Sequence, residues 1–241
     1  MRTLVIRPGA IGDCIRHFPD MEALCTEYTE VWISRPVAPL VLFADRVRAL
    51  ADTGIDLAGL PGMPLPSGLE TFDAIHSWYG TARPEFRAAV AHLPFTFHPA
   101  VPTTPPAAVT RIRLSGPRHA SIILHPFSGS AKKNWPLANF RELAAQLDGV
   151  AWTCGPEEEL PGATRFADLA DLARWISGAR LYIGNDSGIT HLAAAVGTPV
   201  LALFGPTDPS IWRPAGTHVR SIPFATPGEV ATVASEMLRL L

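Results

Sequence analysis

Two segments in the second half of the chain combine small and charged residues as anion-binding loops do. The segment 184–188, Gly-Asn-Asp-Ser-Gly, follows the apolar run 180–183, which suits a buried parallel strand, and precedes an alanine-rich helical run. Asp186 or Ser187 can cap that helix, and Gly188 lets a ligand approach the backbone. The free N–H groups and the dipole of a helix start favour phosphate. Ordinary strand-to-helix turns use the same residue types, so this loop alone leaves both interpretations open.

The second segment, 125–136, reads His-Pro-Phe-Ser-Gly-Ser-Ala-Lys-Lys-Asn-Trp-Pro. It follows the apolar run 120–124 and precedes a helical pattern over 137–147. Lys132 and Lys133 put positive charge at a helix start, where the dipole disfavours it unless an anion is bound. A solvated basic loop is the alternative. Two loops of this kind at one edge of a sheet favour a diphosphate ligand, as in a nucleotide sugar.

The amino terminus supplies a third candidate, built from a strand, a glycine-containing turn and a helix. These elements are expected over residues 3–7, 8–13 and 14–28. Gly9 and Gly12 fit the start of a nucleotide-binding βα unit, without completing the G-x-G-x-x-G pattern. Asp13 lies in the first helical turn, where the dipole favours a carboxylate whatever its role. The functional alternative is a general base that faces a cleft.

The elements that position these loops alternate between strands and helices, which predicts parallel sheets with right-handed crossovers. The strand candidates are 3–7, 30–34, 46–50, 73–77, 121–124, 150–154, 180–183 and 200–204. The segment 99–106 is rich in proline and threonine and is expected to link two domains. We therefore expect an N-terminal acceptor-side domain over 1–104 and a C-terminal nucleotide-sugar-binding domain over 105–241.

Taken together, these loops resemble glycosyltransferase family nine, the ADP-heptose:lipopolysaccharide heptosyltransferases. The matching text is Arg7-x4-Gly12-Asp13, Ser128-Gly-x3-Lys133-x-Trp135-Pro136, Asn185-Asp-Ser-Gly-x2-His191 and Phe204-Gly-Pro-Thr-Asp-Pro209, in the family's order. The resemblance implies an α/β fold of the GT-B type, with two Rossmann-like domains whose parallel sheets face across a cleft. It also implies transfer with inversion and without a required metal. Family members are usually longer than this chain, chiefly in the first domain.

The resemblance also assigns roles to individual residues. Asp13 becomes the catalytic base, and Lys133 neutralises the donor diphosphate. The donor-binding residues that it implies are Ser128, Lys133, Asp186, Ser187, Gly188, His191, Thr207 and Asp208. For His191, phosphate contact and helix packing both stay open. Gly12, Trp78 and Tyr79 are weaker candidates for the acceptor side, because core packing explains the two aromatic rings at least as well.

The resemblance implies transfer of a heptose or related sugar from a nucleotide-diphosphate donor, with ADP-heptose as the first candidate. The acceptor would be a lipopolysaccharide-type, lipid-linked or other glycan. Two alternatives remain: a GT-B enzyme of other specificity for nucleotide sugars, and a non-catalytic nucleotide-sugar-binding module. Asp13 separates a transferase from a binding module, because a transferase needs this carboxylate aimed into the cleft and a binding module does not.

Composition and residue spacing argue against several other classes of protein. The formal net charge of −2 gives no reason to expect nucleic-acid binding. Three cysteines without C-x-x-C spacing indicate reduced thiols in a cytoplasmic protein. We expect no signal peptide, no membrane-spanning segment and at most peripheral contact with the inner membrane. The eight histidines show no metal-ligand spacing and the serines no G-x-S-x-G elbow, so we expect no metal, no other cofactor and no hydrolase.

Overall fold

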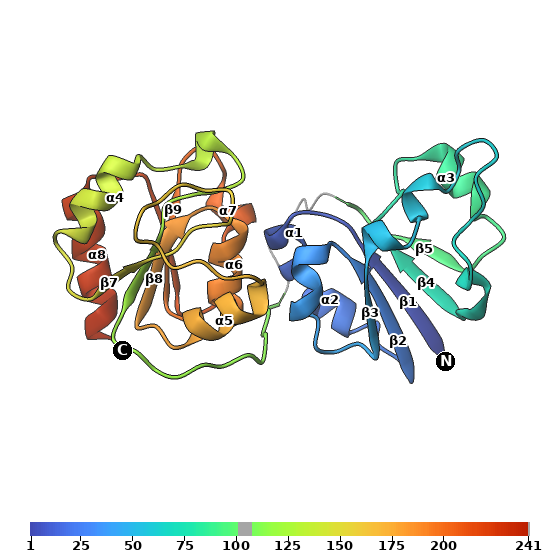
Figure 1. The fold of residues 1–241 in the computed structure, drawn as a ribbon, viewed down its shortest axis with the longest axis horizontal. Helices are drawn as coiled ribbons and strands as arrows, with labels where there is room; N and C mark the ends of the chain where they lie inside the picture. The colour runs from blue at the N-terminus through green and yellow to red at the C-terminus, as the bar shows by residue number, and fades with distance from the viewer. Residues whose placement is uncertain (101–107, 241) are drawn as a thin grey trace. The chain divides into compact units, whose positions relative to one another are not determined.

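The computed structural model describes residues 1–100 and 108–240. The chain divides into two compact units, Met1–Thr103 and Thr104–Leu241, each built on its own sheet (Figure 1). The predicted boundary between 104 and 105 lies outside the described residues, as does most of the predicted linker 99–106. Within the described part of the chain, no helix is both long and apolar enough to cross a membrane.

The first unit is a five-stranded parallel sheet in the order β3-β2-β1-β4-β5. Its strands are β1 (Arg2–Arg7), β2 (Tyr28–Ile33), β3 (Arg46–Ala49), β4 (Ala74–Ser77) and β5 (Phe95–Phe97). Its helices are α1 (Ile11–Ile15), α2 (Phe18–Glu22) and α3 (Pro84–Ala89), with 3-10 turns η1 (Arg35–Leu40), η2 (Leu50–Asp52), η3 (Ile55–Leu57) and η4 (Leu69–Thr71). Leu4 and Ile6 pack against Phe86 of α3, as the two-residue period of a strand requires.

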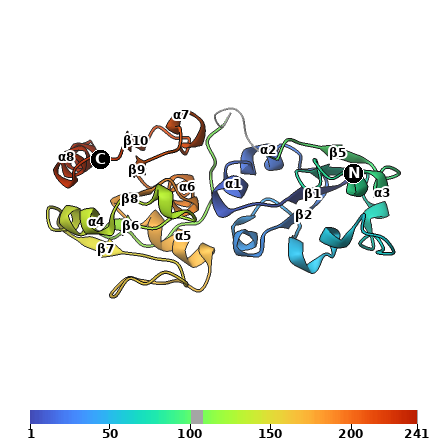
Figure 2. The ribbon, with the colours of Figure 1, turned by 90° about the horizontal axis from the view of Figure 1, so that it is seen from above.

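The second unit is a five-stranded parallel sheet in the order β10-β9-β8-β6-β7. Its strands are β6 (Ile122–His125), β7 (Val150–Trp152), β8 (Leu181–Asn185), β9 (Val200–Phe204) and β10 (Val219–Pro223). Its helices are α4 (Leu137–Ala144), α5 (Leu169–Ser177), α6 (Gly188–Ala195), α7 (Pro209–Trp212) and α8 (Pro227–Arg239), with the 3-10 turn η5 (Ala131–Lys133). Figures 1 and 2 show α4 and α8 on one face of this sheet and α5 and α6 on the other. Covered on both faces, β8 and β9 are buried at every residue.

The structure differs from the expected elements in one helix and two strands. The helix expected over 14–28 is two short helices, because Pro19 has no N–H to donate and instead occupies the first turn of α2. Two strands were not expected. β5 is only three residues long, and β10 interleaves Arg220 and Ser221 with its apolar residues at the sheet edge.

Each sheet has one point where the strand order reverses, between β1 and β4 in the first unit and between β6 and β8 in the second. At such a point the loops that leave the carboxyl ends of the two strands diverge, and doubly wound proteins bind ligands there. Asp13 follows β1, and the two predicted anion loops follow β6 and β8. All three predicted loops therefore leave strands at a reversal point.

Candidate functional site

Three polar side chains from different loops of the second unit meet on one carboxylate oxygen. Lys133 Nζ lies 2.8 Å from Asp186 Oδ2, and the Thr207 hydroxyl donates to the same oxygen at 2.7 Å. Asp186 is 5% exposed, whereas the side chain of Lys133 keeps 30% of its surface exposed. The Lys133 ammonium also lies 5.9 Å from the ring centroid of Trp212. The loops after β6, β8 and β9 thus place a partly exposed cation beside a buried carboxylate.

The start of α6 lies directly after Asp186 in the chain. Ser187 is the N-cap residue: its hydroxyl accepts from the Thr190 N–H at 3.3 Å and lies 3.1 Å from the Thr190 hydroxyl. Gly188 and the next residue are the first of the helix, where backbone N–H groups have no acceptor within the helix. His191, one turn further on, is buried. This helix start offers N–H donors and a positive dipole end beside the Lys133 ammonium.

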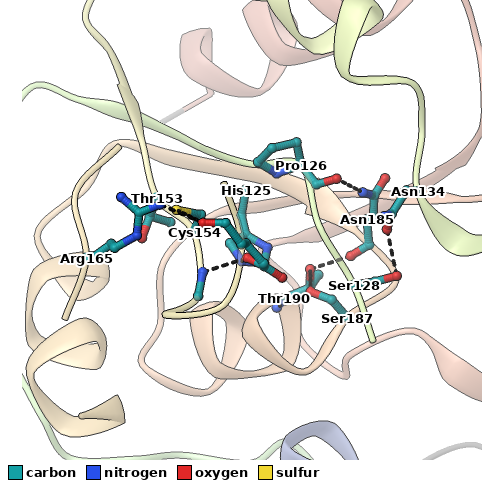
Figure 3. A network of polar contacts seen from close by, with 12 residues as sticks. His125, Pro126, Ser128, Asn134, Thr153, Cys154, Arg165, Asn185, Ser187 and Thr190 are labelled. Carbon is teal, nitrogen blue, oxygen red and sulfur yellow. Dashed lines mark hydrogen bonds and ion pairs between the residues drawn. The ribbon is translucent and has the colours of Figure 1, made fainter. Parts of the chain in front are cut away.

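Asn185, which the sequence did not single out, joins the two anion loops. Its side-chain amide donates to Pro126 O at 2.8 Å (Figure 3). The oxygen of the same amide accepts the Trp135 N–H at 3.0 Å. Ser128 is held within the 125–136 loop, because its hydroxyl donates to Asn134 Oδ1 at 2.8 Å. With no exposed surface, Asn185 fixes the 125–136 loop to the end of β8. In the sequence, its place in the Asn-Asp-Ser-Gly motif was the one signal that could have marked Asn185 as a site residue.

A second polar network at this edge surrounds His125, the last residue of β6 (Figure 3). Burial lowers the pKa of His125 to about 4, although a backbone hydrogen bond at Phe127 opposes that shift. Its Nε2 atom lies 3.7 Å from Glu158 Oε2, and that carboxylate accepts the Gly155 N–H at 2.5 Å. Glu158 is therefore tied into its turn, while Glu157 and Glu159 are exposed.

The remaining donor candidate, Asp208, is exposed and caps α7. Its carboxylate accepts the Ser210 N–H at 2.8 Å, and the hydrogen bonds from Ser210 lower its pKa. Capping explains its position, and its predicted role in donor binding stays a prediction. Among the described residues, no three histidine, cysteine or acidic side chains are grouped so that they could hold a metal ion.

In the first unit, Asp13 lies in the first turn of α1 and is half-buried. Gly12, its neighbour, accepts the Arg16 N–H at 3.1 Å. Trp78 is only 4% exposed and stacks on His98 at a centroid distance of 4.3 Å, while Tyr79 packs edge-on against Phe86. Packing within the first unit therefore explains the positions of both rings, and their contact with an acceptor stays a prediction.

Comparisons with known proteins agree with these arrangements. Residues 100–227 match the family model described as glycosyltransferase family 9 (heptosyltransferase), which is more than half of the 241 residues. The chain belongs to glycosyltransferase family 9. The matched stretch contains both anion loops and the Thr207 loop.

Curated relatives of this glycosyltransferase family 9 chain are lipopolysaccharide heptosyltransferases. Lipopolysaccharide heptosyltransferase 1 of Pseudomonas aeruginosa is 38% identical over 105 aligned positions, and the match covers 37% of this chain and 29% of the relative. Lipopolysaccharide heptosyltransferase 3 of Escherichia coli is 36% identical over 116 aligned positions, and the match covers 39% of this chain and 33% of the relative. The matched stretches thus span about a third of these relatives.

Solved structures of the family share the fold. The E. coli ADP-heptose lps heptosyltransferase II has a TM-score of 0.75 at 16% identity, covering 100% of this chain and 99% of that one. The E. coli heptosyltransferase WaaC with ADP has a TM-score of 0.70 at 16% identity, covering 98% and 100%. Two Rossmann-like α/β units of the GT-B type, as the sequence predicted, are confirmed.

Proposed function

We propose that this protein transfers a heptose or related sugar from a nucleotide-diphosphate donor to a hydroxyl of a lipopolysaccharide-type or other glycan acceptor. Membership of glycosyltransferase family 9 supports this, and so do the names of its structural neighbours, which mention ADP and ADP-heptose. ADP-heptose is therefore the donor to try first. The observation that carries the proposal is the meeting of Lys133, Asp186 and Thr207 beside the start of α6.

On the donor side, this cluster suits a leaving diphosphate. Breaking the bond between a sugar and a diphosphate places negative charge on the phosphate oxygen. Preorganised positive charge and N–H donors stabilise that charge more in the transition state than in the ground state. The Lys133 ammonium exchanges its Asp186 partner for phosphate oxygen, and the first N–H groups of α6 donate to the same group. We propose that these groups act without a divalent cation.

On the acceptor side, we propose Asp13 as general base. The acceptor oxygen attacks the anomeric carbon as its proton passes to the Asp13 carboxylate, and the electron pair of the breaking carbon–oxygen bond leaves with the diphosphate. One displacement of this kind inverts the anomeric centre. The half-buried position of Asp13 at the reversal point of the first sheet supports this role. A lipid-linked acceptor would be met at the inner face of the membrane by peripheral contact.

The test is a transfer assay on Asp13→Asn, with donor affinity measured separately by calorimetry. The amide keeps the size of the side chain but cannot accept the acceptor's proton. We expect kcat to fall by about 10²- to 10⁴-fold while the donor Kd stays unchanged. Near-normal transfer by the variant would return Asp13 to the role of a helix-start carboxylate. If wild-type protein binds the donor tightly but transfers nothing to lipid or oligosaccharide acceptors, the protein is a nucleotide-sugar-binding module.

A further inference from the structure

Arg7 is a charged residue placed where charge is costly. It is the last residue of β1, is 2% exposed and ranks among the largest fully buried side chains. Burial lowers the pKa of Arg7, partly opposed by the Cys14 thiol and the Asp13 carboxylate. Its Nε is buried without a hydrogen-bond partner. A burial this costly calls for a function that an apolar side chain could not supply.

The hydrogen bonds of Arg7 show what that function is. Nη1 donates to Pro8 O at 2.8 Å and Nη2 donates to Asp13 O at 3.0 Å. Both acceptors are main-chain carbonyls at the two ends of the 8–13 turn. One rigid guanidinium therefore clamps the turn to the end of β1. The helix α1 begins within this segment, at Ile11, and has no side-chain cap at Ala10, so it lacks the usual anchor for a helix start.

Gly9 shows how closely the clamp and the carboxylate are packed. Its φ of +130° is unfavourable for a residue with a side chain. A Cβ at Gly9 would lie 3.2 Å from Asp13 Cβ, and 3.7 Å from both Asp13 Oδ2 and Arg7 Nη1. The two side chains therefore converge on the same side of the turn. Behind the guanidinium, Arg7 Cζ lies 6.0 Å from the centroid of the buried Trp78 ring.

We propose that Arg7 is a positioning residue for Asp13. By holding both ends of the 8–13 turn, it fixes the main chain from which the Asp13 carboxylate projects. The inference rests on the proposed function, in which Asp13 takes the acceptor's proton. It adds that the aim of this carboxylate is set by a two-point guanidinium clamp, with Trp78 as its backing.

Two variants test the clamp by kinetics. Arg7→Lys keeps a positive charge but not the planar fork, and Arg7→Met removes both. Each is expected to lower kcat roughly ten- to a hundred-fold while leaving the donor Kd unchanged, because small misplacements of a reacting group are costly. Combined with Asp13→Asn, neither should lower kcat further. The control is Arg48→Met on β3, which removes an arginine whose Cζ lies 5.3 Å from the centroid of the Trp32 ring. Wild-type kcat in Arg7→Lys, or full additivity with Asp13→Asn, would overturn the proposal.

Two further measurements complete the test: one keeps Arg7, and the other does not depend on catalysis. Gly9→Ala strains the turn where the Arg7 and Asp13 side chains meet, and it should also lower kcat without changing donor affinity. In protein labelled with ¹⁵N-glycine, the amide signals of Gly9 and Gly12 should shift or broaden in Arg7→Lys, while glycine signals of the second unit stay in place. Unchanged turn signals would refute the clamp even if the wild-type protein transferred no sugar. Shifted signals together with an active Asp13→Asn variant would instead refute Asp13 as the general base and keep the clamp.

Discussion

Lys133 carries the charge on which proposed donor binding depends. Replacing it by alanine removes a charge-assisted contact to phosphate, which is typically worth about 1.5 to 3 kcal/mol. Lys133→Ala should therefore weaken ADP-heptose binding by roughly ten- to a hundred-fold in calorimetry. The matched control is Lys132→Ala, since Lys132 is the exposed preceding residue of the same 3-10 turn.

Lys133→Ala also leaves the Asp186 carboxylate without its cation, at 5% exposure, and that carboxylate would repel a diphosphate. The double variant Lys133→Met with Asp186→Asn removes both charges and separates the two effects. If Lys132→Ala weakens binding as much as Lys133→Ala, the loop acts through its total charge and Lys133 has no special place.

Single residues of the site could be predicted when their chemistry was visible in the chain itself. Lys133 and Asp186 are charged residues in loops after apolar strands, which made them candidates, and the family resemblance selected Lys133 over Lys132. Their contact with a donor stays a prediction. Asn185 was not predicted, because its function depends on Trp135 and Pro126, 50 and 59 residues away. Arg7 was visible only as part of a motif. Its clamp depends on how the 8–13 turn folds back onto β1.

Among the elements, α6 matters most to the proposed donor site. Ser187→Ala removes the side-chain oxygen that accepts the Thr190 N–H, which costs about 1 kcal/mol of stability. Thr226→Ala, at the capping box of α8, should cost about the same and serves as the control. Of these two variants, we expect only Ser187→Ala to weaken ADP-heptose binding, because α6, unlike α8, starts directly after Asp186, the partner of Lys133. Equal donor affinity in the two variants would contradict a role for the start of α6.

The strands show where element prediction succeeds. β9 is a continuous apolar run and β8 begins as one, because helices cover both faces of each strand, and both strands were predicted. β5 was missed because three residues between a loop and His98-Pro99 give too short a signal. β10 was missed because an edge strand needs no continuous apolar run and tolerates Pro223 at its end. Burial on both faces made β8 and β9 recognisable, whereas β5 and β10 at the sheet edges were missed.

At the scale of the whole molecule, His125 links stability to pH. Its pKa of about 4 in the folded chain lies below the unfolded value of 6.5. Between these values the unfolded chain binds the extra proton, so stability is fully present above pH 6.5 and is lost as the pH falls toward 4. From pH 7 to pH 4 the loss attributable to His125 is about 3 kcal/mol. Urea unfolding of the wild type and of His125→Gln, at both pH values, measures it.

The test compares the stability that the wild type loses on acidification with the stability that His125→Gln loses. This comparison is needed because burial also lowers the pKa of His17, His76 and His98 in the first unit. Those histidines add the same direction of pH dependence to both proteins. His125→Gln should therefore lose less stability than the wild type on acidification, whatever its stability at pH 7. Parallel losses in the two proteins would mean that His125 is solvated or protonated in the fold.

The pairing of Lys133 with Asp186 bears on how quickly and how selectively a donor is captured. Because the ammonium is already balanced by a carboxylate 2.8 Å away, the cluster projects little net field into solvent. Diphosphates would then be captured without strong electrostatic steering, at a rate that depends little on ionic strength. A lone inorganic phosphate must break the same ion pair without the contacts that a nucleoside and a sugar contribute. If the cluster binds the proposed donor, abundant small anions would therefore be poor competitors, and the complete nucleotide sugar would be favoured over its fragments.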